Sequence, residues 1–130
     1  MLTREQILQA QDRVTEVVLV PEWGGEVSVR TMSGREKDHF ESTVAKPGPD
    51  GKPKYNLEDF RARLLCLALV DGDGALLFKH ADIALLSSKS AKALERVFSV
   101  AKRLNGIDDK DIDDMVKNSE AGQGDASPID

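Results

Sequence analysis

Apolar residues alternate with polar ones near the start of the chain, which predicts strands before the helices that fill the rest. The run Val14–Val20 is rich in β-branched residues, and in Glu26–Met32 the positions Val27 and Val29 alternate with polar neighbours. A Gly-Gly pair lies between the two runs, and glycine supplies the positive φ that a chain reversal needs. The pattern therefore predicts an N-terminal β-hairpin.

A capping signal predicts a helix ahead of this hairpin. Thr3 and Gln6 have the spacing of a capping box, in which each side chain accepts a hydrogen bond from the other residue's backbone N–H. A short helix is expected from there to about Gln11, with Ile7 and Leu8 as its apolar anchors.

The same signal opens a helix after the hairpin. Ser33 and Glu36 repeat the capping-box spacing, and the predicted helix runs over about residues 34–45. Phe40 and Val44 lie on one stripe of it and are expected to face the core.

A central helix is predicted over about residues 57–70, capped by Asn56 with Asp59. Its apolar positions recur at helical spacing, and the stretch LLCLALV is apolar on every face. A helix that is apolar all round has to be surrounded by other elements. Leu64 and Leu67 are therefore expected in the core.

The clearest amphipathic pattern covers residues 91–104, opened by Ser90 and ended by Asn105-Gly106. A turn at residues 71–74, a short extended piece, a helical turn at 82–86 and a last short helix after Asp108 complete the assignment. The predicted fold class is α+β and mainly α, with the N-terminal β-hairpin packed on a small bundle of about four to five helices.

Two segments carry no large apolar run that could be buried. Residues 46–54, KPGPDGKPK, are dense in Pro and Gly and predict a flexible loop. Residues 119–130 have the composition of a disordered tail. Neither marks a domain boundary, so residues 1–118 are expected to form one domain.

Composition narrows the classes of function. Only 5% of the 130 residues are aromatic, so Leu, Val and Ala must fill most of the core. The net charge of −5 disfavours nucleic-acid binding, because it repels phosphate backbones. A single cysteine excludes an intrachain disulfide, and no apolar run approaches the roughly 20 residues that span a bilayer. We expect a soluble intracellular protein with no membrane or nucleic-acid partner.

Candidate sites for chemistry are weak. The segment DGDGALLFKHAD resembles a calcium loop but has Leu76 where the sharp turn needs glycine, so it predicts a helix-stopping turn. The carboxylates of DDKDIDD suit the first turn of a helix.

His39 and His80 lie far apart in sequence, and Cys66 is expected to be a small buried apolar residue. We predict no catalytic residue, metal site or cofactor, and hence no enzyme.

Seven basic residues could form a stripe that attracts nucleic acid. On the helix at 91–104 they alternate with Glu95 and lie opposite the apolar face, which is typical of a solvated surface. The seven are Arg61, Arg63, Lys89, Lys92, Arg96, Lys102 and Arg103.

The only tryptophan, Trp23, lies at the predicted hairpin tip between Pro21-Glu22 and two glycines. Two interpretations stay open. Either the hairpin folds over so that Trp23 caps the helical core, or Trp23 is an exposed anchor for a partner, a role that tryptophan often has at interfaces.

Three segments occur in a characteristic order: VPEWGGEVSVRTMSGREKDHFE, FRARLLCLALVDGDGALLF and KSAKALERVFSVAKRLNG. Together they resemble the tail assembly chaperone family of long-tailed bacteriophages and prophages. The resemblance runs from about Leu2 to Asn118 and leaves out the Pro/Gly loop and the tail.

The resemblance implies a non-enzymatic assembly factor in the cytoplasm of the bacterial host. Such a factor binds the tape measure protein, keeps it soluble, helps to recruit tail tube subunits and is absent from the mature virion. Self-association into a homo-oligomer stays open. The alternative is a small cytoplasmic regulatory or nucleic-acid-binding adaptor of prophage origin.

A chaperone for an amphipathic helix needs accessible apolar grooves on a soluble body. The alternative for each apolar residue is that it fills the core. The candidate contact residues for a partner are Trp23, Glu22, Phe40, Phe78 and Phe98.

Overall fold

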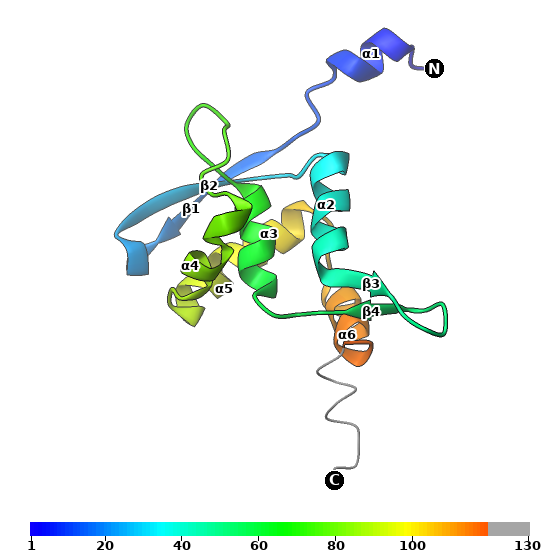
Figure 1. Cartoon of the computed structure of the whole chain (residues 1–130). Helices are drawn as coiled ribbons and strands as arrows, with labels where there is room; N and C mark the ends of the chain where they lie inside the picture. Colours follow the sequence, from blue (N-terminus) through cyan, green and yellow to red (C-terminus); the bar gives the residue numbers. More distant parts are fainter. Residues whose placement is uncertain (120–130) are drawn as a thin grey trace.

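The hairpin predicted from the alternating valines forms one side of a three-stranded antiparallel sheet. In the computed structural model, β1 (Thr15–Val20) pairs with β2 (Gly25–Arg30), and β2 pairs with the short strand β5 (Leu69–Val70). The strand order β1-β2-β5 leaves β1 at an edge. Figure 1 shows the long β1–β2 ribbon beside the helices, which confirms the predicted α+β class.

The structure describes residues 1–119, and residues 120–130, with all but the first residue of the predicted tail, lie outside the described part. Besides the three strands, the elements are α1 (Arg4–Gln9), η1 (Pro21–Trp23), α2 (Gly34–Val44), β3 (Ala45–Pro47), β4 (Pro53–Tyr55), α3 (Phe60–Ala68), η2 (His80–Asp82), α4 (Ile83–Ser87), α5 (Ala91–Leu104) and α6 (Asp109–Lys117).

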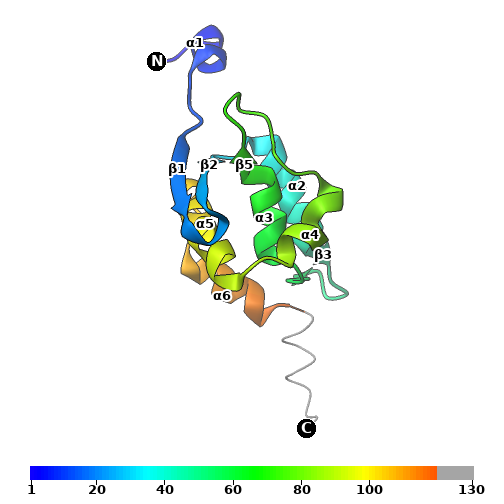
Figure 2. The same cartoon turned by 90° about the vertical axis from the view of Figure 1, so that its left-hand side faces the viewer.

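The core lies between the inner face of the sheet and the helices. In Figure 2, β1 and β2 lie on one side of the molecule, next to α5, and α3 runs between α5 and α2. Val20 and Val29 of the sheet, Leu64 and Leu65 of α3, and Val97 of α5 are fully buried. Burying such side chains contributes about 1.5–3 kcal/mol each, so this layer supplies much of the stability of the fold.

The central helix α3 is shorter than predicted. It begins at Phe60 because Asp59 adopts a left-handed conformation (φ 57°), which breaks the helical path, and the predicted capping pair of Asn56 with Asp59 does not form. Asn56 instead accepts a hydrogen bond from the N–H of Glu58. The end of the predicted helix becomes β5, and Leu67 is only half-buried.

The segment predicted as a loop contains a small hairpin. Strands β3 and β4 pair through Lys46 opposite Lys54, and the N–H of Gly48 donates to the carbonyl of Lys52 at 2.8 Å. Tyr55 then bridges to Ser119, which is only 2% exposed, contrary to its predicted place in a disordered tail. The predicted mobility of residues 46–54 remains a prediction.

The first helix forms with its predicted capping box, but its predicted role as an anchored element is wrong. Ile7 and Leu8 are 56% and 65% exposed, and α1 has no buried residue. Figure 1 shows α1 at the end of an arm, away from the rest of the molecule. Within residues 1–119, no helix is long and apolar enough to cross a membrane.

Candidate functional site

The tip of the β1–β2 hairpin is fastened to α5. After Val20 the chain turns through η1, and Gly24 closes the turn at φ 73°, a conformation that glycine adopts without strain. The carboxylate of Glu22 accepts two hydrogen bonds from Arg96, from Nε at 3.1 Å and from Nη2 at 2.9 Å. These bonds lower the pKa of the Glu22 carboxyl below its ordinary value of 4.5. The tip is therefore held in one orientation over the helices.

Trp23 folds back toward the core from this tip. Its side chain is half-buried and packs against the core cluster, while its indole Nε1 is buried without a hydrogen-bond partner among the described residues. A buried N–H without an acceptor is unfavourable by about 1–3 kcal/mol. Trp23 thus combines apolar contact area with a free donor.

A groove of about 510 Å³ opens beside Trp23. Four of the six side chains that line it are aromatic or aliphatic, and the other two are one carboxylate and one ammonium. Leu85 of α4 is 68% exposed along it. The lining residues are Glu22, Trp23, Phe78, Leu85, Leu86 and Lys89.

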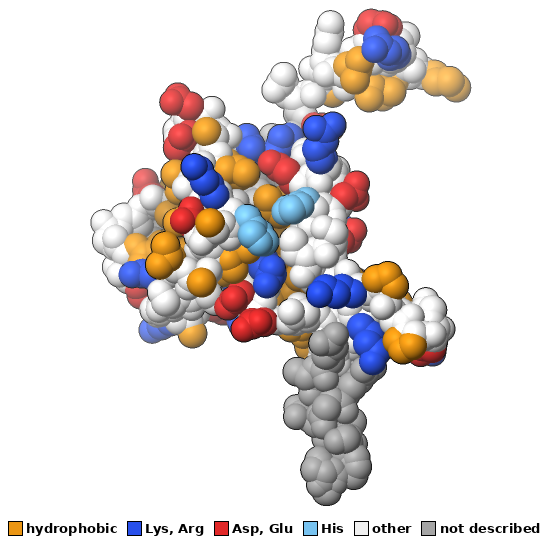
Figure 3. All heavy atoms as spheres, in the orientation of Figure 1, with side chains coloured by type: hydrophobic (Ala, Val, Ile, Leu, Met, Phe, Trp, Pro, Cys, Tyr) orange, Lys and Arg blue, Asp and Glu red, His pale blue; other side chains and the backbone are white. Residues whose placement is uncertain are grey.

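A second cavity of about 280 Å³ lies on the other side of Phe78, which lines both hollows. It brings together two histidines that are far apart in sequence: the rings of His39 and His80 are 6.3 Å apart, at 72° to each other. Figure 3 shows the two histidines side by side, with hydrophobic side chains around them. Burial raises the pKa of the neighbouring Cys66 thiol to about 11, which keeps it protonated and unreactive.

The structure separates the five predicted contact residues into two groups. Trp23, Glu22 and Phe78 meet at the groove. Phe40 and Phe98 are only 1% and 3% exposed, and each ring packs edge-on against Phe60. These two are core residues, which corrects their prediction as contacts for a partner.

The predicted basic stripe is largely neutralised by carboxylates. Arg61 pairs with Glu95 at 2.8 Å, Arg103 with Glu16 at 2.7 Å and Lys102 with Asp109 at 3.0 Å, in addition to the pair at Arg96. Paired charges attract a phosphate backbone weakly, because each cation already has a counter-ion.

The acidic segments serve local structure. One carboxylate oxygen of Asp71 accepts from the N–H groups of Asp73 and Ala75, which makes the predicted turn. Asp108 and Asp111 form the capping box of α6. Among residues 1–119, no cluster of three or more His, Cys, Asp or Glu side chains could hold a metal ion.

Comparison with solved structures shows what this architecture is similar to. The structure of the bacteriophage HK97 tail assembly chaperone superposes with a TM-score of 0.54, over 77% of this chain and 94% of that chain, at 21% sequence identity. The chain shares its fold with this phage tail assembly chaperone. No protein-family model and no curated protein matches the sequence.

Three of the six residues that line the groove were not predicted from the sequence as contact residues. Leu85 and Leu86 lie in the segment 82–86 that predicted only a helical turn, and Lys89 was predicted only as part of the basic stripe. The spacing of the leucines does not show which of them is covered: Leu86 is 4% exposed and its neighbour 68%. The one usable signal was the presence of two adjacent leucines on a helix too short to bury both.

Proposed function

We propose that this chain is a tail assembly chaperone of a long-tailed phage or prophage, acting without catalysis in the bacterial cytoplasm. It binds the tape measure protein, keeps it soluble and helps to recruit tail tube subunits, and it is absent from the mature virion. The observation that carries the proposal is the shared fold, which spans 94% of the phage chaperone. The order of the three characteristic sequence segments supports it independently.

The groove beside Trp23 is the surface that we propose for the client. A tape measure protein is long and helical, and an amphipathic helix binds an apolar groove through side chains spaced three and four residues apart. Trp23 and Phe78 provide broad aromatic surfaces, and Leu85 provides an exposed aliphatic one.

The two charged residues that line the groove suit a soluble complex. Glu22 is held by Arg96, so its carboxylate stays ionised at neutral pH. Lys89 lines the same groove. Charged groups around an apolar centre keep the free surface hydrated and exclude water from the contact only when the client is bound.

The test is coexpression with the tape measure protein encoded in the same phage or prophage. Wild-type chaperone is expected to keep the tape measure protein in the soluble fraction and to copurify with it. Leu85→Asp is expected to abolish both effects without unfolding the chain, because the side chain is 68% exposed.

Val116→Asp is the matched control, since Val116 is 47% exposed on α6 and does not line the groove. It is expected to behave like wild type. A tape measure protein that stays insoluble with wild-type chain contradicts the proposed function. If both variants lose solubilisation and copurification of the tape measure protein equally, the groove is not the surface that binds the client.

A further inference from the structure

The second cavity, which shares Phe78 with the groove, is lined by basic and apolar side chains and, among the described residues, by no carboxylate. We call it the histidine cavity. Five of its lining residues are apolar, one is a threonine and four carry a basic nitrogen. The chain as a whole has the opposite balance, with 23 acidic residues against 18 lysines and arginines. The four basic residues are His39, Arg63, Lys79 and His80.

The two cations of this cavity differ from the paired cations of the basic stripe, because they have no counter-ion. Within residues 1–119, neither Arg63 nor Lys79 forms an ion pair with a carboxylate. Arg63 donates through Nε to the backbone carbonyl of Glu58 at 2.9 Å, which leaves its outer N–H groups available. The carboxylate of Asp82 accepts from the backbone N–H of Lys79 at 2.9 Å and does not pair with the ammonium.

The basic residues bring N–H donors together from separate elements. His39 comes from α2, Arg63 from α3, and Lys79 and His80 from the start of η2. The two imidazole rings lie 6.3 Å apart. An imidazole donates at least one N–H in either protonation state, and a guanidinium presents paired N–H groups that match the two oxygens of a carboxylate. This side of the cavity is therefore suited to an anion.

The apolar side of the cavity restricts the kind of anion. Leu76 is 38% exposed, and Phe78 is half-buried beside it. An inorganic phosphate is hydrated on all sides and gains nothing from this wall, whereas an aliphatic group gains by leaving water. The volume of about 280 Å³ lies near the lower end of the roughly 300–1,000 Å³ of ligand sites, so the apolar group has to be compact.

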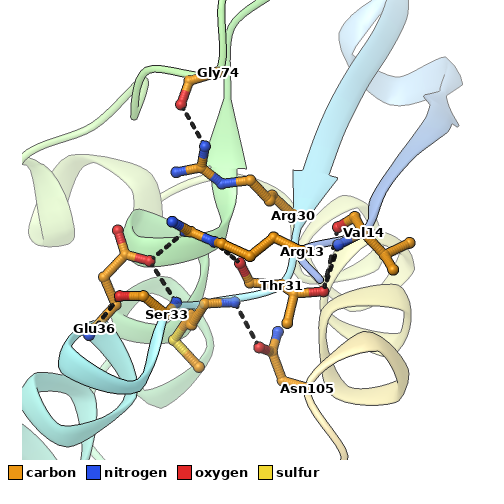
Figure 4. Close-up of polar contacts among 9 residues, drawn as sticks. Arg13, Val14, Arg30, Thr31, Ser33, Glu36, Gly74 and Asn105 are labelled. Carbon is orange, nitrogen blue, oxygen red and sulfur yellow. Dashed lines mark hydrogen bonds and ion pairs between the residues drawn. The ribbon is translucent and has the colours of Figure 1, made fainter. Parts of the chain in front are cut away.

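The walls of the cavity are held in place by polar contacts outside it. Arg30 donates through Nη1 to the carbonyl of Gly74 at 2.7 Å, which fixes the loop that leads to Phe78 (Figure 4). At the start of α2, the helix that carries one of the histidines, Glu36 pairs with Arg13 at 2.7 Å (Figure 4). A site with fixed walls binds its ligand without the entropy cost of ordering them.

We propose that the histidine cavity binds a carboxylate joined to a compact apolar group. The carboxylate accepts hydrogen bonds from Arg63, Lys79 and the imidazole N–H groups, and the apolar group lies against Leu76 and Phe78. Two sources offer this chemistry: a free organic acid, and an acidic residue next to an apolar one in a protein segment. The inference goes beyond the proposed function and does not rest on it, so its test uses the chain alone.

An NMR titration of the histidine signals tests this site. The chain has two histidines and both line the cavity, so both Cε1–H signals report on it. The probe is 4-methylpentanoate, added at constant pH and ionic strength. Its neutral analogue is 4-methylpentanamide, and acetate lacks the apolar group. Both signals are expected to shift saturably with 4-methylpentanoate, which binds about tenfold or more tightly than the amide or acetate.

Replacing a cation of the cavity is expected to weaken this binding. Lys79→Gln is expected to weaken it about tenfold and to retain the fold, because the side chain is exposed. Arg63→Gln is expected to weaken it further, because a guanidinium binds both carboxylate oxygens. The matched control is Lys110→Gln, since Lys110 is exposed on α6 and does not line the cavity. It is expected to bind like wild type.

The capped tripeptide acetyl-Leu-Glu-Leu-amide distinguishes the two sources of the carboxylate. Tighter binding than 4-methylpentanoate assigns the cavity to a protein segment, and weaker binding assigns it to a free organic acid. Equal shifts with 4-methylpentanoate and its amide, shifts that do not saturate, or equal weakening by Lys79→Gln and Lys110→Gln overturn the proposal. Inorganic phosphate that binds as tightly as 4-methylpentanoate overturns the apolar half of the site.

Discussion

Glu22 and Arg96 lie 74 residues apart in sequence and form a bidentate ion pair that holds the hairpin tip against α5. This contact orients Trp23 against the core and thereby shapes one wall of the groove. A partly exposed ion pair contributes little to stability, so its main effect is on geometry.

The pair predicts a dependence of stability on pH. The pKa of Glu22 is lowered in the folded chain, so its contribution is present above the unfolded pKa, near 4.5, and is lost as the pH falls through the folded pKa. The melting temperature of wild-type chain is expected to fall more than that of Glu22→Gln between neutral pH and a pH below 4.5. Thermal denaturation followed by circular dichroism measures both. Parallel curves for the two proteins would contradict a contribution of this pair to the stability of the folded chain.

Leu64 and Leu85 look alike in the sequence, but the structure buries the first and exposes the second. Leu64→Ala is expected to lower the free energy of unfolding by about 2–5 kcal/mol, because Leu64 is fully buried in α3. Leu85→Ala is expected to change it by less than about 0.5 kcal/mol, because that side chain is exposed. Urea denaturation gives both values. Similar values for the two variants would contradict the assignment of Leu85 to a free surface.

The small β3–β4 hairpin should tolerate replacement of its turn. Exchanging residues 48–52 for a Gly/Ser linker of equal length removes no large apolar side chain, so the melting temperature is expected to change little. Tyr55 stays in place and keeps its bridge to Ser119. A large loss of stability after this exchange would show that the turn packs on the body of the protein.

The thiol of Cys66 reports on opening of the fold. It is 4% exposed and its pKa is about 11, so a thiol reagent at pH 8 is expected to label native chain slowly and urea-unfolded chain at the rate of a free cysteine. The rate of colour development with a disulfide reagent measures this. Rapid labelling of the native chain would place Cys66 on an accessible wall of the histidine cavity.

Features encoded in short stretches of sequence were predictable. The capping boxes at Thr3, Ser33 and Asp108 all form, because each depends on residues three positions apart. The helix α5 has the predicted bounds, since a Ser cap, a continuous apolar stripe and an Asn-Gly end agree with one another. The hairpin followed from alternation and its glycines.

Features that depend on distant contacts were not predictable. The capping pair at Asn56 fails because Asp59 adopts a left-handed conformation, which residue identity alone does not indicate. Phe40 and Phe98 resemble Phe78 as isolated aromatics, yet only Phe78 reaches the surface. Which face of an element is covered is decided by the neighbours it meets, and those come from other parts of the chain.

The central claim is that the groove beside Trp23 binds a helical segment of the tape measure protein. Trp23 is the only tryptophan, so its fluorescence reports directly on this groove when tryptophan-free peptides spanning the tape measure protein are titrated in. A saturable shift of the emission to shorter wavelength is expected for at least one amphipathic segment with wild-type chain and Val116→Asp, and none with Leu85→Asp. Unchanged emission with every segment, under conditions where the tape measure protein still copurifies with the chain, would contradict the claim.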